Sequence, residues 1–250
     1  MEKFIKTVTV TGADDRNVLR ELLEISCDYS FAEFGILLSK KHFGAIRYPS
    51  RSWLEKLHNL AGSLPFGRKG FNLSGHICGE WVRKLCVGEG DFFEELDPIW
   101  EIFQRFQLNF HGEPHKFLES ECVGIIKGYL PGKTIIVQMD GVNDHILHTL
   151  RANNIDAVPL FDKSSGAGIL PDVWPKKLAD IYCGYAGGLS PENLANEIPK
   201  LFEQTGPSPI WIDAETLLRT AFGSEGAKYG DHFDLKKVRD FLTAAQPWVI

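Results

Sequence analysis

The chain has 250 residues, of which 44% are hydrophobic and 24% charged, so one domain with a substantial core fits its length. Its net charge of −6 and the lack of a long Lys or Arg run argue against nucleic acid as the main partner. No stretch reaches the roughly 18 to 20 apolar residues of a membrane helix, and the start lacks the apolar core of a signal peptide. We therefore expect a cytoplasmic protein with no membrane contact.

Strand and helix patterns alternate along the whole chain. Strands are predicted at residues 5–11, 32–39, 72–78, 107–111, 134–140, 157–162, 181–185 and 210–213. Helices are predicted at 15–25, 50–60, 80–85, 92–106, 114–128, 142–152, 172–178, 191–202 and 235–245. A strand followed by a helix, repeated to the end, indicates a parallel sheet.

Several of these strands alternate polar and aliphatic side chains, as Thr7, Thr9 and Thr11 do with Val8 and Val10. In a strand this period of two places each set on its own face. An open parallel sheet is covered on both faces, and its strands are continuous apolar runs. We therefore predict an α/β fold in which residues 1–250 form a single (β/α)8 TIM barrel with polar side chains in its lumen, in preference to an open doubly wound sheet.

Titratable side chains are expected at the carboxyl ends of the strands, where such barrels place their chemistry. The candidate catalytic residues at this rim are His76, His111, Asp140, Asp162 and Asp213. Carboxylates forced together split their pKa values, so one can serve as an acid and another as a base. The alternative for Asp140 and Asp213 is that they cap loops or form ion pairs with nearby lysines.

Glycine-containing loops follow the sixth and seventh strands. Residues 161–168 offer free backbone amides, and residues 186–193 run directly into a helix amino terminus. Glycine lets the backbone approach a phosphate closely, and the helix end supplies N–H groups and partial positive charge. The residues expected to contact substrate or phosphate are Gly166, Gly168, Gly187, Gly188, Asn109 and Gln138.

A metal site is a competing hypothesis for the run His111-Gly112-Glu113-Pro114-His115. Two imidazoles and a carboxylate near a strand end could bind zinc or iron, with Asp140 or Asp213 completing the ligand set. Pro114 prevents a regular helical display of the two imidazoles. The five cysteines are widely spaced and contain no C-x-x-C pair. We therefore predict no metal and no other cofactor, and keep a metal-dependent hydrolase or lyase as an alternative function.

Three parts of the chain resemble phosphoribosylanthranilate isomerase, a (β/α)8 barrel of the ribulose-phosphate-binding type in tryptophan biosynthesis. That family has an Asp before a G-G-T-G loop after strand 6, a G-G-L-x-P-x-N turn after strand 7, and a Q-L-H-G-like strand 4. The matching segments here are residues 162–168 with Trp174, residues 186–194 and residues 107–112. The resemblance implies that Asp162 is the general acid of an Amadori rearrangement and that Gly187 and Gly188 contact substrate phosphate.

The chain departs from this family at two places. The family's general base is a Cys at the end of strand 1, where this chain has Thr11, and a hydroxyl cannot act as a base near neutral pH unless another group takes its proton. The family's Gly-containing phosphate turn after strand 8 is replaced by residues 213–219. We expect a divergent isomerase or lyase acting on a small phosphorylated, sugar-derived metabolite, with a non-catalytic metabolite-binding barrel as the alternative. Its aromatic residues would leave apolar surface for a homodimer.

Overall fold

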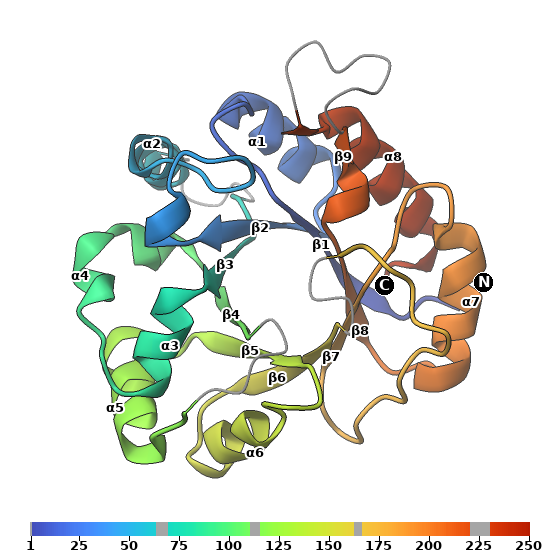
Figure 1. The fold of residues 1–250 in the computed structure, drawn as a ribbon. Coiled ribbons are helices and arrows are strands. Elements are labelled where there is room, and N and C mark those ends of the chain that lie inside the picture. The colour runs from blue at the N-terminus through green and yellow to red at the C-terminus, as the bar shows by residue number, and fades with distance from the viewer. Residues whose placement is uncertain (1, 64–69, 111–115, 163–166, 221–230) are drawn as a thin grey trace.

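Eight parallel strands close into a barrel in the computed structural model, which describes residues 2–63, 70–110, 116–162, 167–220 and 231–250 (Figure 1). Each strand pairs with the next along the chain, and the eighth pairs with the first. The strands are β1 (Ile5–Thr11), β2 (Ala32–Leu38), β3 (Leu73–Cys78), β4 (Arg105–Asn109), β5 (Thr134–Met139), β6 (Ala157–Phe161), β7 (Cys183–Ala186) and β8 (Ile210–Ala214). The closed pairing confirms the predicted TIM barrel.

Helices surround the barrel in Figure 1. They are α1 (Leu19–Asp28), α2 (Arg51–Ser63), α3 (Glu80–Cys86), α4 (Phe92–Glu95), α5 (Glu119–Tyr129), α6 (His145–Ala152), α7 (Leu194–Thr205) and α8 (Leu235–Ala245). Short 3-10 turns are η1 (Lys40–His42), η2 (Ile99–Ile102), η3 (Thr216–Leu218) and η4 (Gln246–Trp248), and β9 (Arg219–Thr220) pairs with β10 (His232–Phe233). Within the described ranges, every helix is too short or too polar to cross a bilayer.

Two helix predictions were wrong. Residues 172–178 contain no helix, because Pro175 lacks a backbone N–H and disfavours the helical conformation of the residue before it. That residue, Trp174, is buried instead, and its indole donates a hydrogen bond to Glu197 of α7 at 3.0 Å. The predicted helix at 92–106 is split around Pro98 into α4 and η2, and its last two residues begin β4.

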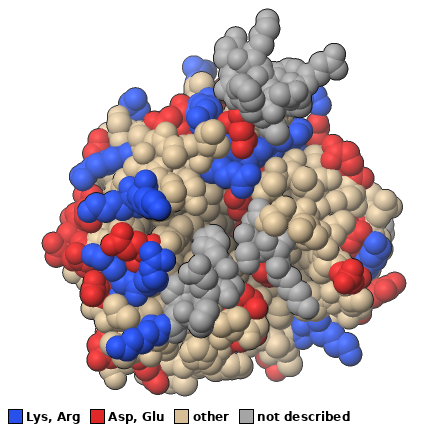
Figure 2. Space-filling model, viewed as in Figure 1, with Lys and Arg blue, Asp and Glu red and all other residues tan. Residues whose placement is uncertain are grey.

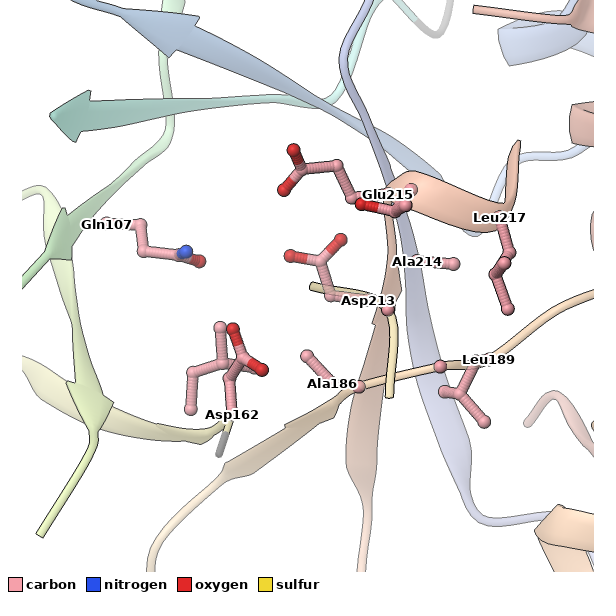
Figure 3. A pocket seen from close by; sticks show the side chains of 13 residues that line it. Gln107, Asp162, Ala186, Leu189, Asp213, Ala214, Glu215 and Leu217 are labelled. Carbon is pink, nitrogen blue, oxygen red and sulfur yellow. The ribbon is translucent and has the colours of Figure 1, made fainter. Parts of the chain in front are cut away.

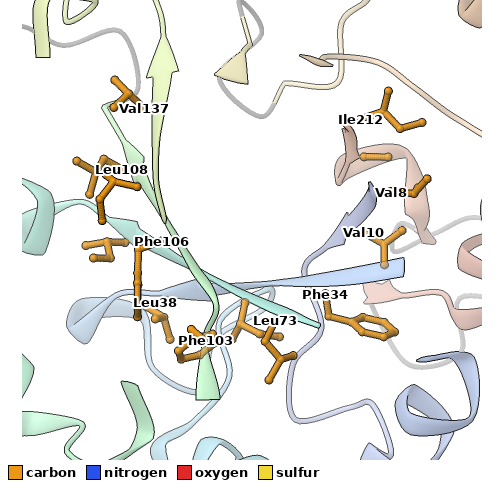
Figure 4. Close-up of a cluster of buried hydrophobic side chains, with 14 of the residues drawn as sticks. Val8, Val10, Phe34, Leu38, Leu73, Phe103, Phe106, Leu108, Val137 and Ile212 are labelled. Atoms are coloured by element: carbon orange, nitrogen blue, oxygen red, sulfur yellow. The ribbon is translucent and has the colours of Figure 1, made fainter. Parts of the chain in front are cut away.

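The aliphatic faces of the strands form the main core between the barrel and its helices. Figure 4 shows part of it, with Val8 and Val10 of β1, Phe34 of β2 and Leu108 of β4 pointing away from the lumen. All four side chains are fully buried. The stability of the fold therefore comes largely from the outer shell, since burial of such side chains contributes about 1.5 to 3 kcal/mol each.

A smaller apolar cluster fills part of the lumen, on the side of β5, β6 and β8. Its buried members are Ile136, Val158, Leu160 and Trp211. A Cβ atom on Gly184 of β7 would lie 2.1 Å from Cε2 of Trp211, so only glycine admits this indole. The lumen side of β1, β3 and β4 is polar instead, as the alternation predicts.

The charged side chains on the face in Figure 2 are mixed in sign. Lys and Arg lie among Asp and Glu and form no continuous basic band in this view. A protein that follows a nucleic-acid backbone presents such a band. The described part of the face in this view shows no such band.

Candidate active site

A pocket opens at the carboxyl ends of β6, β7 and β8. It is lined by Gln107, Leu160, Asp162, Gly168, Ala186, Gly187, Gly188, Leu189, Asp213, Ala214, Glu215, Thr216 and Leu217. Figure 3 shows the carboxyl groups of Asp162, Asp213 and Glu215 and the side-chain amide of Gln107 pointing into the same space. This is the end of a barrel where catalytic groups are expected.

Asp213 is the most perturbed carboxyl group of the pocket. It lies in β8 and is 6% exposed, and the hydroxyl of Thr11 donates a hydrogen bond to its Oδ1 at 2.9 Å. Burial raises the pKa of Asp213 well above its usual range, and the nearby carboxylates of Glu215, Glu33 and Asp162 raise it further. Asp213 therefore holds its proton to a higher pH than an exposed aspartate does.

Asp162 follows β6 directly and lies in a different environment. The side-chain Nε2 of Gln138 in β5 donates to its Oδ2 at 3.1 Å. The other end of the same amide, Oε1, accepts the backbone N–H of Phe110 at 3.0 Å. Gln138 was predicted to contact the substrate, but it is 2% exposed and does not line the pocket. Its side chain instead positions Asp162.

Glu215 is a pocket residue that was not among the predicted site residues. It continues the inward period of two from Trp211 through Asp213, and that spacing places it just beyond the rim. Nη1 of Arg47 donates to its Oε1 at 3.1 Å. Burial raises the pKa of Glu215, Arg47 lowers it, and the carboxylate of Asp162 raises it again, with a net rise.

The side-chain oxygen of Gln107 is the second missed feature of the pocket. Gln107 is 5% exposed, and its Nε2 donates to Oδ1 of Asn109 at 2.6 Å. Nδ2 of Asn109 in turn donates to the thiol of Cys78 at 3.2 Å. Oε1 of Gln107 is buried and has no hydrogen-bond partner among the described residues. Gln107 therefore offers an acceptor to a ligand, whereas Asn109, predicted as a contact, lies behind it.

His76 lies deeper in the barrel than the pocket. It is 1% exposed, and its Nε2 is 3.1 Å from the hydroxyl oxygen of Ser74. Burial lowers its pKa to about 4, with Glu33 opposing this effect and Arg105 adding to it. His76 is therefore a neutral imidazole at physiological pH and does not line the pocket.

Asp140 caps a turn at the end of β5. Its Oδ1 accepts the backbone N–H groups of Val142 and Asn143, each at 2.8 Å, as in the alternative considered from the sequence. His111 and Gly166 lie outside the described residues. Of the predicted catalytic residues that the structure describes, the pocket brings together Asp162 and Asp213 only.

The glycine turn after β7 adopts conformations that require glycine. Gly187 has φ of 117° and Gly188 has φ of 63°. A Cβ atom on Gly188 would lie 2.5 Å from the backbone N of Leu170, so the turn packs directly on the connection after β6. Asn193 fixes the turn, because its Nδ2 donates to the carbonyl of Gly188 at 2.7 Å and its Oδ1 accepts the N–H of Ser190 at 2.9 Å.

The connections after β6 and β8 also touch at this rim. Gly168, with φ of 71°, lies so close to Thr216 that an added Cβ atom would be 3.2 Å from that side chain. Gly168, Gly187 and Gly188 all line the pocket, where phosphate contacts were predicted. The described part of the chain holds no group of three or more His, Cys, Asp or Glu side chains that could bind a metal ion.

Comparisons with protein-family models and with curated proteins give no match. Phosphoribosylanthranilate isomerase from Thermotoga maritima has a similar solved structure, with TM-score 0.54 and 15% identity over 97% of this chain and 100% of its own. A phosphoribosylanthranilate isomerase in complex with reduced 1-(o-carboxyphenylamino)-1-deoxyribulose 5-phosphate has TM-score 0.55 and 15% identity, with the same coverage. N-(5′-phosphoribosyl)anthranilate isomerase from Pyrococcus furiosus has TM-score 0.51 and 18% identity over 96% of this chain and 98% of its own. The resemblance noted in the sequence therefore extends to the fold of nearly the whole chain.

Proposed function

We propose that this protein is an isomerase or lyase that acts on a small phosphorylated, sugar-derived metabolite by proton transfer between Asp162 and Asp213. The observation that carries the proposal is that two carboxyl groups in unequal environments face one pocket. Asp213 is buried with a raised pKa, while Asp162 accepts a hydrogen bond from Gln138. Two carboxyl groups whose environments differ can divide the roles of acid and base.

Proton transfer between Asp162, Asp213 and the substrate needs no cofactor. The carboxylate of Asp162 removes a proton from the carbon next to a carbonyl or imine of the substrate. The carboxylic acid of Asp213 delivers its proton to the oxygen or nitrogen, which gives an enol or enamine. In an isomerisation, Asp162 then returns its proton to the former carbonyl or imine carbon, while Asp213 takes a proton from the hydroxyl or amine on the first carbon. In a lyase reaction, Asp213 takes back the enol or enamine proton, while a leaving group departs from the neighbouring carbon with the proton held by Asp162.

Asp213 also lies next to Thr11, the residue that replaces the family's cysteine at the end of β1. Thr11 stands where the resembling family has its cysteine base, and its hydroxyl donates to Oδ1 of Asp213 at 2.9 Å. The end of β1 thus supplies no base, and the carboxyl group beside it, Asp213, acts as the acid, so the base of the proposed reaction is Asp162, the general acid in the resembling family. This supports a catalytic pair rebuilt from β6 and β8.

The glycine turn after β7 supports a phosphate anchor. Gly187, Gly188 and Leu189 line the pocket, and the turn leads into α7, which begins at Leu194. Backbone N–H groups before a helix favour an anion. The raised pKa values of Asp213 and Glu215 reduce the negative charge that a phosphate group would meet.

The experiment combines a binding assay with proton exchange. A panel of phosphorylated ketoses and aminodeoxyketoses is screened for a rise in melting temperature. Binders are then incubated with the protein in D2O, and loss of the carbon-bound proton next to the carbonyl is followed by ¹H NMR. We expect exchange with the wild type and with the control Asp91→Asn, whose carboxylate pairs with Lys84 on the surface. We expect binding without exchange for Asp162→Asn.

Full exchange in Asp162→Asn would overturn the proposal. A ligand that raises the melting temperature of the wild type, but is neither exchanged nor consumed, would favour the second candidate, a metabolite-binding barrel without catalysis. The presence of Thr11 in place of a cysteine is the observation that keeps this candidate in view.

A further inference from the structure

A second, larger cavity lies at the opposite end of the barrel, where the strands begin. It has a volume of about 730 Å³. Its charged lining residues are Lys6, Glu33, Arg105, Asp156, Lys177 and Asp180. The proposed reaction uses none of these side chains.

Arg105 is the buried cation of this cavity. It is 8% exposed, and its Nε donates to Oε2 of Glu33 at 2.8 Å while Nη2 donates to Oε1 at 2.5 Å. Its guanidinium carbon lies 4.6 Å from the ring centre of Trp211. The remaining nitrogen, Nη1, is buried and has no hydrogen-bond partner among the described residues. Two N–H donors of a buried guanidinium are thus unused, which is costly unless something accepts them.

Stability alone does not account for this ion pair. Ile136, Val158 and Trp211 fill the neighbouring part of the lumen with apolar side chains. Replacing a buried ion pair by apolar residues of similar volume is often neutral or stabilising. A guanidinium at this depth is better explained by the binding of an anion, since its planar donors match the geometry of carboxylate and phosphate oxygens.

Two lysines at the rim add positive charge near Arg105. Nζ of Lys6 lies 5.7 Å from the ring centre of Tyr182, and Nζ of Lys177 donates to the carbonyl of Leu178 at 3.3 Å. Neither lysine has a carboxylate within ion-pair distance in the described part of the chain. The acidic side chain of Asp156 accepts the hydroxyl of Thr134 at 2.6 Å.

We propose that the amino-terminal mouth of the barrel binds a small oxyanion, a carboxylate or a phosphate. Nη1 of Arg105 donates to the anion, and Lys6 and Lys177 balance its charge from the rim. The site is separate from the substrate pocket, which lies at the other end of the strands.

The test uses succinate and inorganic phosphate as probes in calorimetric titrations of the full chain. The double variant Lys6→Ala/Lys177→Ala removes both rim charges, and Lys56→Ala/Lys236→Ala is the matched control on α2 and α8. We expect binding to weaken about tenfold or more in the first variant, and to stay at the wild-type value in the control. The two probes distinguish a carboxylate site from a phosphate site.

Two further measurements separate this site from the proposed phosphate anchor. Amide chemical shifts should change with succinate at Lys6 and Tyr182 and stay constant at Gly188. Glu33→Gln removes the carboxylate that competes for Arg105, so we expect it to bind succinate several-fold more tightly than the wild type. Undetectable succinate and phosphate binding, equal affinities in the two lysine double variants, or shifts confined to Gly188 would overturn the proposal.

Discussion

Replacing Asp213 by asparagine should make the protein more stable at neutral pH. Asparagine cannot ionise, and its Oδ1 still accepts the hydroxyl of Thr11, which donates to Asp213 at 2.9 Å. Because burial raises the pKa of Asp213 in the folded state, the unfolded chain loses this proton at a lower pH than the folded chain does. The wild type therefore loses stability as pH rises above the unfolded pKa near 4, until the folded pKa is passed.

The size of this effect follows from proton linkage. Each pH unit between the unfolded and folded pKa values costs the wild type about 1.4 kcal/mol relative to Asp213→Asn. In a chain of this size, each kcal/mol corresponds to about 2 to 4 °C in melting temperature. The two proteins should differ least near pH 4, and the advantage of the variant should grow as pH rises from there until the folded pKa is passed.

Urea unfolding followed by circular dichroism, repeated from pH 4.5 to 8, measures this difference. The control is Asp91→Asn, since Asp91 is an exposed surface carboxylate paired with Lys84. A difference between the wild type and Asp213→Asn that does not change with pH would refute the reasoning. Lower stability of the variant at pH 8 would refute it as well.

Two other predictions concern the pocket turn and the lumen. Gly188→Ala should destabilise the fold by about 2 kcal/mol or more, because φ is 63° and the new Cβ would lie 2.5 Å from the backbone N of Leu170. In the same urea assay Gly124→Ala, in the open middle of α5, should be stabilising. His76, whose burial lowers its pKa to about 4, should stay neutral in ¹⁵N NMR spectra at pH 6 and destabilise the fold as pH falls from about 6.5 to 4, because only the unfolded chain gains its proton there. Titration of this imidazole near pH 6.5 would contradict the buried placement.

The strands were predictable because polar and aliphatic residues alternate in the sequence with the period of two of a β-strand. β1 has the predicted bounds, and the alternation of polar and aliphatic residues correctly gave a closed barrel. The absence of a helix at residues 172–178 was not predictable from hydrophobic spacing. Pro175 disfavours a helix there, and Trp174 instead donates a hydrogen bond to Glu197. The cytoplasmic location, the homodimer and the absence of cofactors stay predictions.

The site was only partly predictable, because strand ends in a barrel do not lie at one level. His76 lies two residues before the end of β3 and does not line the pocket, although it looked equivalent to Asp213 in the sequence. Asp140 lies one residue beyond β5, where its own turn uses its oxygens as hydrogen-bond acceptors. Glu215 lies one residue past the end of β8 and lines the pocket; the sequence places it just beyond the rim, but it was not among the predicted catalytic residues.

The separation of an aliphatic outer shell from a polar lumen has a consequence for how this protein can change over evolutionary time. Most of the residues that hold the helices to the strands face outward, as Val8, Phe34 and Leu108 do. Residues that touch a bound molecule face inward from the same strands. Mutations can therefore change the inward-facing residues while the outward-facing residues are preserved, so new specificities can arise on this scaffold with little loss of stability.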